Sequence, residues 1–198
     1  MKALDDFDLL YLEENFAKQS QALLAKHPRV PEADLKKIVG IPQSQVDAKL
    51  ADHAQHALPL KLRTGQHIGY IQRGHDEDVA LTADILLENL CTKVAGTMAL
   101  RSMLAGSNID PLKIQYVIGS GEEAVGDRYN RGGGNMAKAV AEKAGLMNAT
   151  GSDVKAFCCA PVHAMVVAGS LVASGVFQDV AVMGGCSLAK LGMKYQGH

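Results

Sequence analysis

The chain of 198 residues is long enough for one or two domains, and its 47% hydrophobic content is enough for a sizeable core. Its 20 basic and 21 acidic residues give a net charge of −1, so the overall charge offers no argument for binding to nucleic acid or to a membrane surface. No apolar stretch is long enough to span a bilayer, and the acidic N-terminal residues do not form a secretory signal.

Residues 1–60 are predicted to be mainly helical. Apolar residues recur with a period near 3.6 over 4–16, and this helix is expected to end near Pro28. Two shorter helices, over 35–39 and 46–58, have the rhythm of a DNA-reading helix-turn-helix. Because acidic residues slightly outnumber basic ones in this segment, two packed helices that bind no nucleic acid are the favoured interpretation.

Residues 61–198 show a different pattern, in which strands and helices alternate. Strands are predicted over 67–72, 114–119, 154–159 and 180–184, and helices over 79–104, 136–144 and 160–174. This order indicates an α/β fold with a parallel sheet and helices on both of its faces. We therefore expect two regions, a helical N-terminal segment over 1–60 and an α/β region over 61–198. Functional sites in such sheets lie at the carboxyl ends of the strands.

One strand–helix–strand unit, residues 154–184, carries the strongest functional signal. Its helix, 160–174, is apolar nearly all round, which predicts a buried helix that ends at Gly175. Cys159 is placed where the strand ends and the helix begins. The positive end of a helix favours an ionised thiol at that place, so Cys159 is a candidate nucleophile.

Structural roles compete with this interpretation of Cys159, because cysteines are often buried without any chemistry. Alternation along the strand sends Cys158 to the opposite face, where it is expected to be a small core residue. His163, one helical turn after Cys159, is a second catalytic candidate that could approach the thiol, although a packed core residue is the more frequent case. The four cysteines have neither a disulfide framework nor a C-x-x-C pair, which indicates a reducing, cytoplasmic location and no metal site.

A glycine-rich loop after the strand 114–119 is the other candidate site. Its glycines can present bare backbone N–H groups in front of a helix, and its arginines add positive charge, as anion sites require. The candidates for binding phosphate or a carboxylate-bearing donor are Arg128, Arg131, Gly132, Gly133 and Gly134. The loop is not a P-loop, because no G-K-[ST] sequence follows, and an ordinary surface loop is the alternative.

A resemblance to known proteins rests on two stretches of the sequence. The first stretch is K-A-F-C-C-A-P-V-H-A-M-V-V-A-G-S-L-V-A-S-G-V-F-Q-D-V-A-V-M-G-G. It resembles the nucleophile strand, helix and following strand of thiolase-like condensing enzymes, especially 3-oxoacyl-acyl-carrier-protein synthase III. The beta subunit of component C of the glycine/sarcosine/betaine reductase complex is more similar still, through this stretch and V-I-G-S-G-E-E-A-V-G-D-R-Y-N-R-G-G-G-N-M-A-K-A-V-A-E. The resemblance is strong over 114–198, weaker from Gln66 and marginal before it.

This resemblance implies the fold of the N-terminal half of a thiolase-like protein over 61–198 and an acyl-accepting role for Cys159. It implies an acyl-transferring subunit of a reductase complex, in which a cysteine forms an acetyl thioester and inorganic phosphate releases acetyl phosphate. The implied partners are the alpha subunit of component C, the selenoprotein component and phosphate, in a homo- or hetero-oligomer, and no cofactor is implied. The backbone N–H of Cys159 is expected to help hold the oxyanion.

The second half of a thiolase-like protein supplies catalytic residues that nothing in this chain matches, so we expect a fragment, a domain or half of a split protein that is catalytically incomplete alone. The resemblance further implies a sheet in which the strand 67–72 lies between 114–119 and 180–184, with the Cys159 strand at a dimer-forming edge. That order puts Cys186 three strand spacings from Cys159, on the order of 14 Å, which is too far for a disulfide.

Two other functions remain open. One is a synthase III-type acyltransferase or condensing enzyme that uses acyl-CoA or acyl carrier protein. The other is a non-catalytic half-fold assembly module that pairs through an exposed sheet edge. Reaction of the thiol with acetyl phosphate or with acetyl-CoA separates the reductase-complex subunit from the synthase III-type enzyme. A stable monomer counts against the assembly module.

Overall fold

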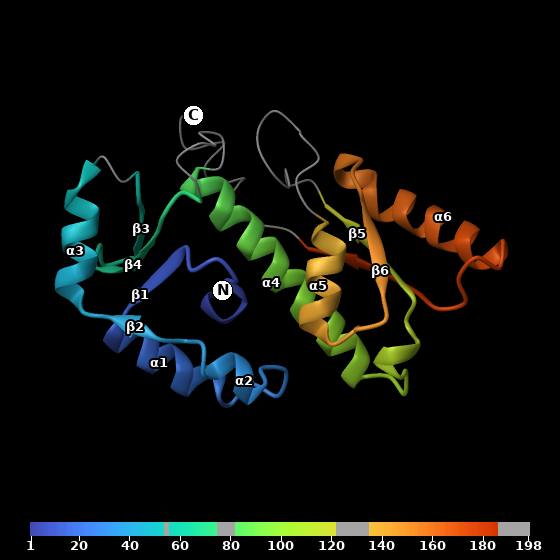
Figure 1. Ribbon diagram of the computed structural model, residues 1–198, viewed down its shortest axis with the longest axis horizontal. Helices are drawn as coiled ribbons and strands as arrows, with labels where there is room; N and C mark the ends of the chain where they lie inside the picture. Colours follow the sequence, from blue (N-terminus) through green and yellow to red (C-terminus); the bar gives the residue numbers. More distant parts are fainter. Residues whose placement is uncertain (54–55, 75–81, 122–134, 186–198) are drawn as a thin grey trace. The chain divides into compact units, whose positions relative to one another are not determined.

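The computed structural model of the chain describes residues 1–53, 56–74, 82–121 and 135–185. Among these, residues 1–90 form one compact unit and residues from 91 onward form another, and helix α4 (Ala83–Ala105) runs from the first into the second (Figure 1). Along the chain, the boundary between the two units lies between residues 90 and 91, whereas it was expected between 60 and 61. The reason is that strand β3 (Leu58–Lys61) pairs with strand β4 (His67–Ile71) inside the first unit.

The first unit is built on a four-stranded sheet with the order β2-β1-β4-β3. Strands β1 (Leu10–Glu13) and β2 (Gly40–Ile41) pair in parallel, whereas β4 pairs antiparallel with both β1 and β3. Its helices are the 3-10 helix η1 (Lys2–Leu4) and the α-helices α1 (Glu14–Leu24), α2 (Glu32–Leu35) and α3 (Gln43–Ala51). The predicted helical segment is therefore present, but strands run through it as well.

The first predicted helix is wrong over its middle part, where the chain forms strand β1. Leu10 is 1% exposed and pairs with Ile71 of β4, so packing between strands outweighs the helical period of the sequence. The carboxylate of Glu13 then accepts hydrogen bonds from two backbone N–H groups of the first turn of α1, at 2.8 and 2.9 Å. These bonds lower the pKa of Glu13 and cap the helix, which explains why α1 begins directly after it.

The second unit is built on a three-stranded parallel sheet with the order β6-β5-β7. Strand β5 (Tyr116–Ser120) lies at the centre, and β6 (Thr150–Val154) and β7 (Val180–Gly184) pair with it on either side. The predicted α/β class with a parallel sheet is confirmed. The expected strand order is wrong, because β7 pairs directly with β5 and β4 belongs to the sheet of the first unit.

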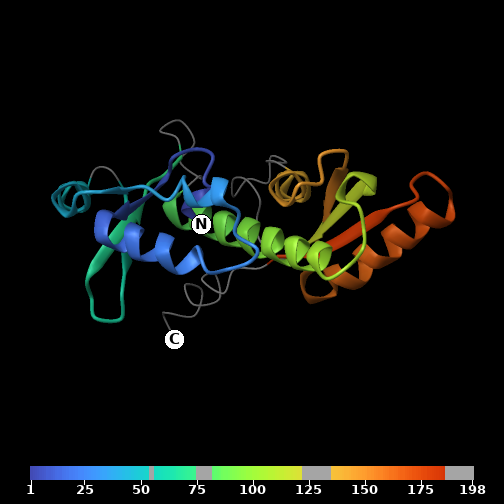
Figure 2. The ribbon, with the colours of Figure 1, turned by 90° about the horizontal axis from the view of Figure 1, so that it is seen from below.

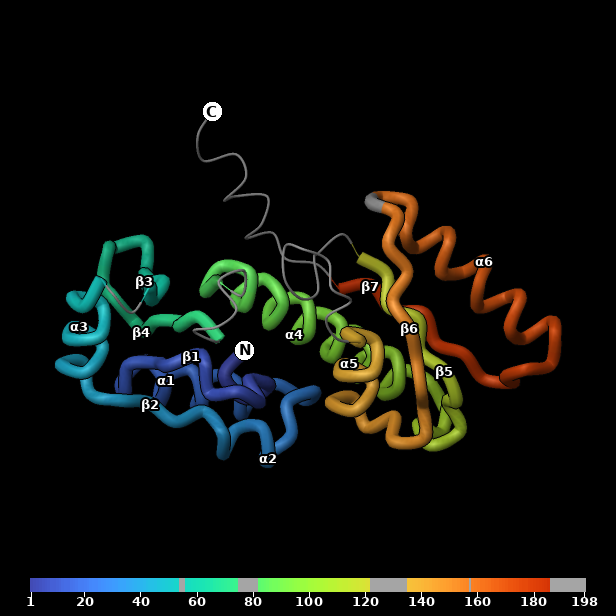
Figure 3. The backbone as a smooth tube through the Cα atoms, turned by 45° about the horizontal axis from the view of Figure 1, so that its top comes forward, coloured from blue at the N-terminus to red at the C-terminus, as the bar shows by residue number. Residues whose placement is uncertain are grey.

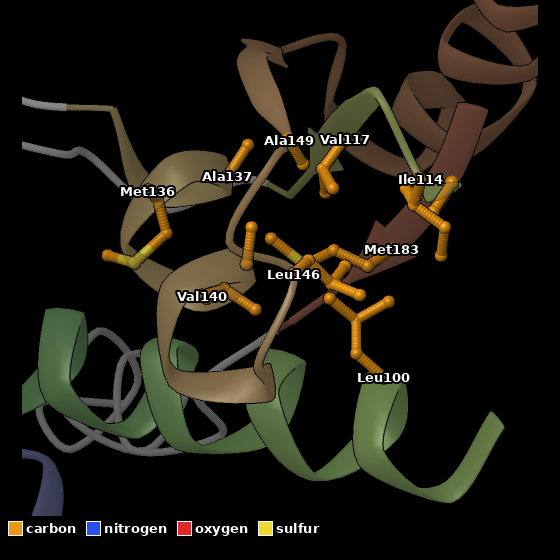
Figure 4. Close-up of a cluster of buried hydrophobic side chains, with 11 residues drawn as sticks. Leu100, Ile114, Val117, Met136, Ala137, Val140, Leu146, Ala149 and Met183 are labelled. Atoms are coloured by element: carbon orange, nitrogen blue, oxygen red, sulfur yellow. The ribbon is translucent and has the colours of Figure 1, made fainter. Parts of the chain in front are cut away.

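Helices cover both faces of this parallel sheet. Helix α5 (Met136–Ala144) lies on one face and helix α6 (Ala160–Ala173) on the other (Figures 1, 2 and 3). On the α5 side, the second half of α4 completes a core whose buried side chains are Leu100, Ile114, Val117, Met136, Ala137, Val140, Ala141, Leu146, Ala149, Ala181 and Met183 (Figure 4). Gly96 lets α4 approach closely, since a Cβ atom there would lie 2.8 Å from the sulfur of Met183.

Helix α6 is not the buried helix that its apolar sequence predicts. Ala160 and Ala164 are fully buried and belong to the side that contacts the sheet. On other sides of the helix, Val162 and Val166 are 58% and 62% exposed. The predicted end of the helix is confirmed, because Gly175 adopts the left-handed conformation with a φ of 73° directly after the last turn.

Candidate functional site

The carboxyl ends of the three parallel strands lie at one edge of the sheet. The strand register pairs Ser120 of β5 with Val154 of β6 and with Gly184 of β7. The hydroxyl of Ser120 donates a hydrogen bond to the carbonyl of Met183 at 3.2 Å, which ties the ends of β5 and β7 together. The segments that lead to the predicted glycine-rich loop and to Cys159 therefore leave the sheet at the same edge, as parallel pairing requires.

Cys159 lies at the N-terminus of α6, but it does not end a strand. Strand β6 ends at Val154, and a 3-10 helix η4 (Phe157–Cys159) leads into α6. Cys158 and Cys159 are both exposed, since the alternation of a strand does not apply within such a turn. The prediction that Cys158 is a small core residue is therefore wrong.

Cys159 stands at the point where η4 gives way to α6. Cys159 is the N-cap residue of α6, and within the described residues its side chain makes no capping hydrogen bond. The positive end of the α6 dipole lies at this position. The backbone N–H of Cys159 itself donates to the carbonyl of Ala156 at 3.1 Å. The expectation that this N–H helps to hold an oxyanion is therefore contradicted.

His163 follows Cys159 by four residues and so lies one turn further along the same side of α6. Its side chain is exposed, which means that it is not the packed core residue that the helical pattern favoured. An exposed imidazole on this side of the helix is accessible to a ligand near the thiol. Its catalytic role stays a prediction.

The predicted anion-binding residues cannot be placed in this structure. Arg128, Arg131, Gly132, Gly133 and Gly134 all lie outside the described residues, and so their role stays a prediction. The helix that follows the loop, α5, is described from its first residue. Its N-terminus therefore shows what an anion would meet there.

Polar side chains of the chain itself close the N-terminus of α5. The carboxylate of Asp153, at the end of β6, accepts hydrogen bonds from the backbone N–H groups of Met136 and Ala137, at 2.8 and 3.1 Å. The side-chain oxygen of Asn135 accepts a third bond, from the backbone N–H of Lys138 at 2.9 Å. An anion that used these N–H groups would have to displace Asp153.

Asp153 has a structural role that the sequence analysis missed. Burial raises the pKa of its carboxyl group, while hydrogen bonds from the backbone N–H groups of α5 and the charge of Lys155 act in the opposite direction. Gly119 of β5 makes room for this carboxylate, because a Cβ atom at Gly119 would lie 2.2 Å from Oδ1 of Asp153. The sequence marks this role of Asp153 only by an acidic residue that stands directly before the predicted strand 154–159.

The described part of the chain offers neither a cluster of metal ligands nor a membrane-spanning helix. Within residues 1–53, 56–74, 82–121 and 135–185, no three His, Cys, Asp or Glu side chains gather in a way that could hold a metal ion. In the same part of the chain, no helix combines the length and the apolar character needed to cross a membrane. Cys186, which the sequence analysis placed too far from Cys159 for a disulfide, lies outside the described residues.

Comparisons with known proteins extend the resemblance seen in the sequence. No family model matches the chain. The priming β-ketosynthase of the R1128 polyketide biosynthetic pathway is a similar solved structure over 47% of this chain and 26% of its own, with 29% sequence identity and a TM-score of 0.41. The beta subunit of component C of the glycine/sarcosine/betaine reductase complex from Peptoclostridium acidaminophilum is 41% identical over all 198 residues, and the chain spans 38% of the length of that relative. The predicted resemblance to this subunit is thus confirmed along the whole chain, including the residues before Gln66, where it was expected to be marginal.

Proposed function

We propose that this chain is part of a component C-type subunit of a glycine, sarcosine or betaine reductase complex, in which Cys159 carries an acetyl group. The observation that carries the proposal is the exposed thiol of Cys159 at the N-terminus of α6, where its side chain makes no capping hydrogen bond to any described residue. Its similarity along the whole chain to a component C beta subunit supports the assignment to such a complex. The alpha subunit of component C and the selenoprotein component are the proposed protein partners.

The proposed release step is an acyl transfer to inorganic phosphate. A phosphate oxygen attacks the carbonyl carbon of the thioester, the carbon–sulfur bond breaks, and the thiolate of Cys159 leaves as acetyl phosphate forms. The positive end of α6 stabilises negative charge on the sulfur as it leaves. Because the backbone N–H of Cys159 is engaged by Ala156, the donors for the oxyanion have to come from elsewhere, which fits a chain that is incomplete for catalysis alone.

Acetylation of the thiol tests this proposal in the reverse direction. The full chain is incubated with acetyl phosphate and separately with acetyl-CoA, and the acetylated residue is located by peptide mass spectrometry. We expect acetyl phosphate to label Cys159 as a thioester that hydroxylamine removes. Cys159→Ala should abolish the label, and Cys158→Ala, which removes the neighbouring exposed thiol, should retain it.

The donor that reacts separates the alternatives. Labelling by acetyl-CoA but not by acetyl phosphate would favour a synthase III-type acyltransferase instead. No labelling by either donor, with Cys159→Ala indistinguishable from the unchanged chain, would contradict both enzymes for this chain. The proposed phosphate site would be abandoned if Arg128→Ala and Arg131→Ala left the dependence of the reaction on phosphate unchanged.

A further inference from the structure

Strand β6 forms one edge of the parallel sheet among the described residues. The backbone N–H of Thr150 donates to the carbonyl of Gln115 at 3.0 Å, so the backbone groups of Thr150 point toward β5. Successive residues of a strand turn their backbone groups to opposite sides. The carbonyl groups of Ala149 and Gly151 therefore point away from β5, to the side on which a further strand would pair.

Side chains from the start of α5 occupy both of these carbonyl groups. The amide nitrogen of Asn135 donates to the carbonyl of Gly151 at 2.5 Å, and the ammonium group of Lys138 donates to the carbonyl of Ala149 at 2.7 Å. The two donors are three residues apart, which places them side by side on one face of the helix. Asn135 and Lys138 together thus lie along the edge of β6, and we call this pair the α5 strap.

Further contacts hold the α5 strap in place. The side-chain oxygen of Asn135 accepts a bond from the backbone N–H of Lys138 at 2.9 Å, which leaves its amide nitrogen for Gly151. The carboxylate of Asp153 binds two backbone N–H groups in the same turn of α5. A Cβ atom at Gly151 would lie 3.3 Å from Cβ of Ala137, so glycine there lets the helix approach the strand. Positions 149, 151 and 153 of the chain are therefore all bonded to the first turn of α5.

We propose that the α5 strap keeps the edge of β6 closed, so that the same strand of a second copy of this chain pairs there only after Asn135 and Lys138 release it. An edge strand is complementary to itself in the antiparallel orientation, because a two-fold axis brings the donors of each copy opposite the acceptors of the other. Such pairing needs the carbonyl groups of Ala149 and Gly151 as acceptors, and the strap already occupies them. Polar and charged side chains at an edge strand commonly oppose unwanted pairing in this way.

The α5 strap sets how strongly two copies associate through this edge. Each copy has to give up two hydrogen bonds, one of them from a charged donor, before its strand can pair. Removing both donors should therefore tighten the association by at least about tenfold. This inference does not rest on the acyl-transfer chemistry of Cys159, so the failure of either proposal leaves the other standing.

A strap-removal experiment on the full 198-residue chain tests the proposal. In the double variant N135S/K138M, serine keeps an oxygen that caps α5, but its side chain is too short to cap the helix and reach Gly151 as well. Methionine keeps the apolar stem of the lysine without its ammonium group. Sedimentation velocity across the micromolar range should show that this variant dimerises at least about tenfold more tightly than the unchanged chain. Lys138→Met alone, which leaves the cap of α5 in place, should show a smaller change in the same direction.

A matched control has the same substitutions outside β6. The side chain of Asn148 donates to the carbonyl of Leu112 at 2.9 Å, and Lys113 is exposed, so N148S/K113M removes the same amide and the same charge. This control should associate like the unchanged chain.

Hydrogen exchange locates the contact. The backbone N–H groups of Gly151 and Asp153 point to the free side of β6, and in N135S/K138M they should exchange more slowly at high protein concentration than at low. A strap variant that associates no more tightly than the control overturns the proposal. Tighter association without slower exchange at these two amides overturns it as well.

Discussion

Helices α5 and α6 flank the same parallel sheet, yet their N-termini differ. Asp153 and Asn135 occupy backbone N–H groups in the first turn of α5, whereas the N-cap residue of α6, Cys159, makes no side-chain cap among the described residues. The sequence predicts a functional site at both helix starts, one after a glycine-rich loop and one after two cysteines. This difference shows that a helix N-terminus suits a ligand or a nucleophile only where other side chains of the protein do not already occupy its backbone N–H groups.

Their surfaces differ in the same direction. Helix α5 has its residues Met136, Ala137, Val140 and Ala141 buried in the core that α4 completes, whereas Val162, Met165 and Val166 of α6 are exposed. Among the described residues, α5 is thus held at its N-terminus and along one side, and α6 along the side that contacts the sheet. Removing the groups that close α5, or changing the exposed side of α6, therefore breaks this contrast.

The largest effect is expected at Gly119, which makes room for the cap of α5. Gly119→Ala would place a methyl group 2.2 Å from Oδ1 of Asp153 and 3.1 Å from the side chain of Met183. We expect the free energy of unfolding, measured by urea denaturation, to fall by about 2–3 kcal/mol. Adding Asp153→Ala should make the loss in the double variant smaller than the sum of the two single losses. Additive losses would show that the methyl group does not meet the carboxylate.

Removing the cap itself is expected to have a smaller effect. Asp153→Ala leaves the backbone N–H groups of Met136 and Ala137 without their acceptor, and the free energy of unfolding should fall by about 1–2 kcal/mol. Hydrogen exchange at these two amides should become faster. Unchanged exchange at both amides would contradict the capping role.

The pH dependence of stability should report the burial of Asp153. Because burial raises the pKa of this carboxyl group in the folded chain, its contribution to stability is fully present below the pKa of the unfolded chain and is lost as the pH rises through the folded pKa. In Asp153→Asn this dependence should disappear. The stability of the unchanged chain relative to Asp153→Asn should therefore fall as the pH rises through that window, and a rise would contradict the assignment.

The smallest effect is expected on the open side of α6. Gly169→Ala adds a methyl group that meets nothing within 4 Å and removes the flexibility of a glycine within a helix. We expect the free energy of unfolding, measured by urea denaturation, to rise by about 0.5–1 kcal/mol. A loss of stability would mean that this position is already in contact within one copy of the chain.

Local elements of the second unit could be predicted closely from the sequence. The helix expected over 136–144 is Met136–Ala144, and the strand expected over 180–184 is Val180–Gly184. The position of Cys159 at the start of α6 was also predicted, although the preceding strand ends five residues earlier than the apolar run suggested. An apolar run of that length is equally compatible with a strand and with a turn that leads into a helix.

The candidate site was less predictable, because it depends on contacts between distant residues. Asp153 meets the start of α5, which lies 17 residues before it in the chain, and no local pattern in the sequence marks that meeting. The exposure of Cys158 and of His163 likewise follows from the turn η4 and from the side of α6 that faces the sheet. Neither property can be inferred from the apolar character of the segment.

The α/β class, helices α5 and α6, strands β5 and β7, the glycine that ends α6 and the resemblance to a component C beta subunit all followed from the sequence, whereas the strand expected over 154–159 did not. Local propensity, apolar periodicity and residue identity are sufficient for these properties. Tertiary contacts were needed to show that β4 pairs with β1 and β3, that Asp153 fills the N-terminus of α5 and that Val162, Met165 and Val166 of α6 are exposed. The physical reason is that pairing, capping and burial depend on which distant segments meet, and a helix that is apolar all round does not show which of its sides the fold will cover.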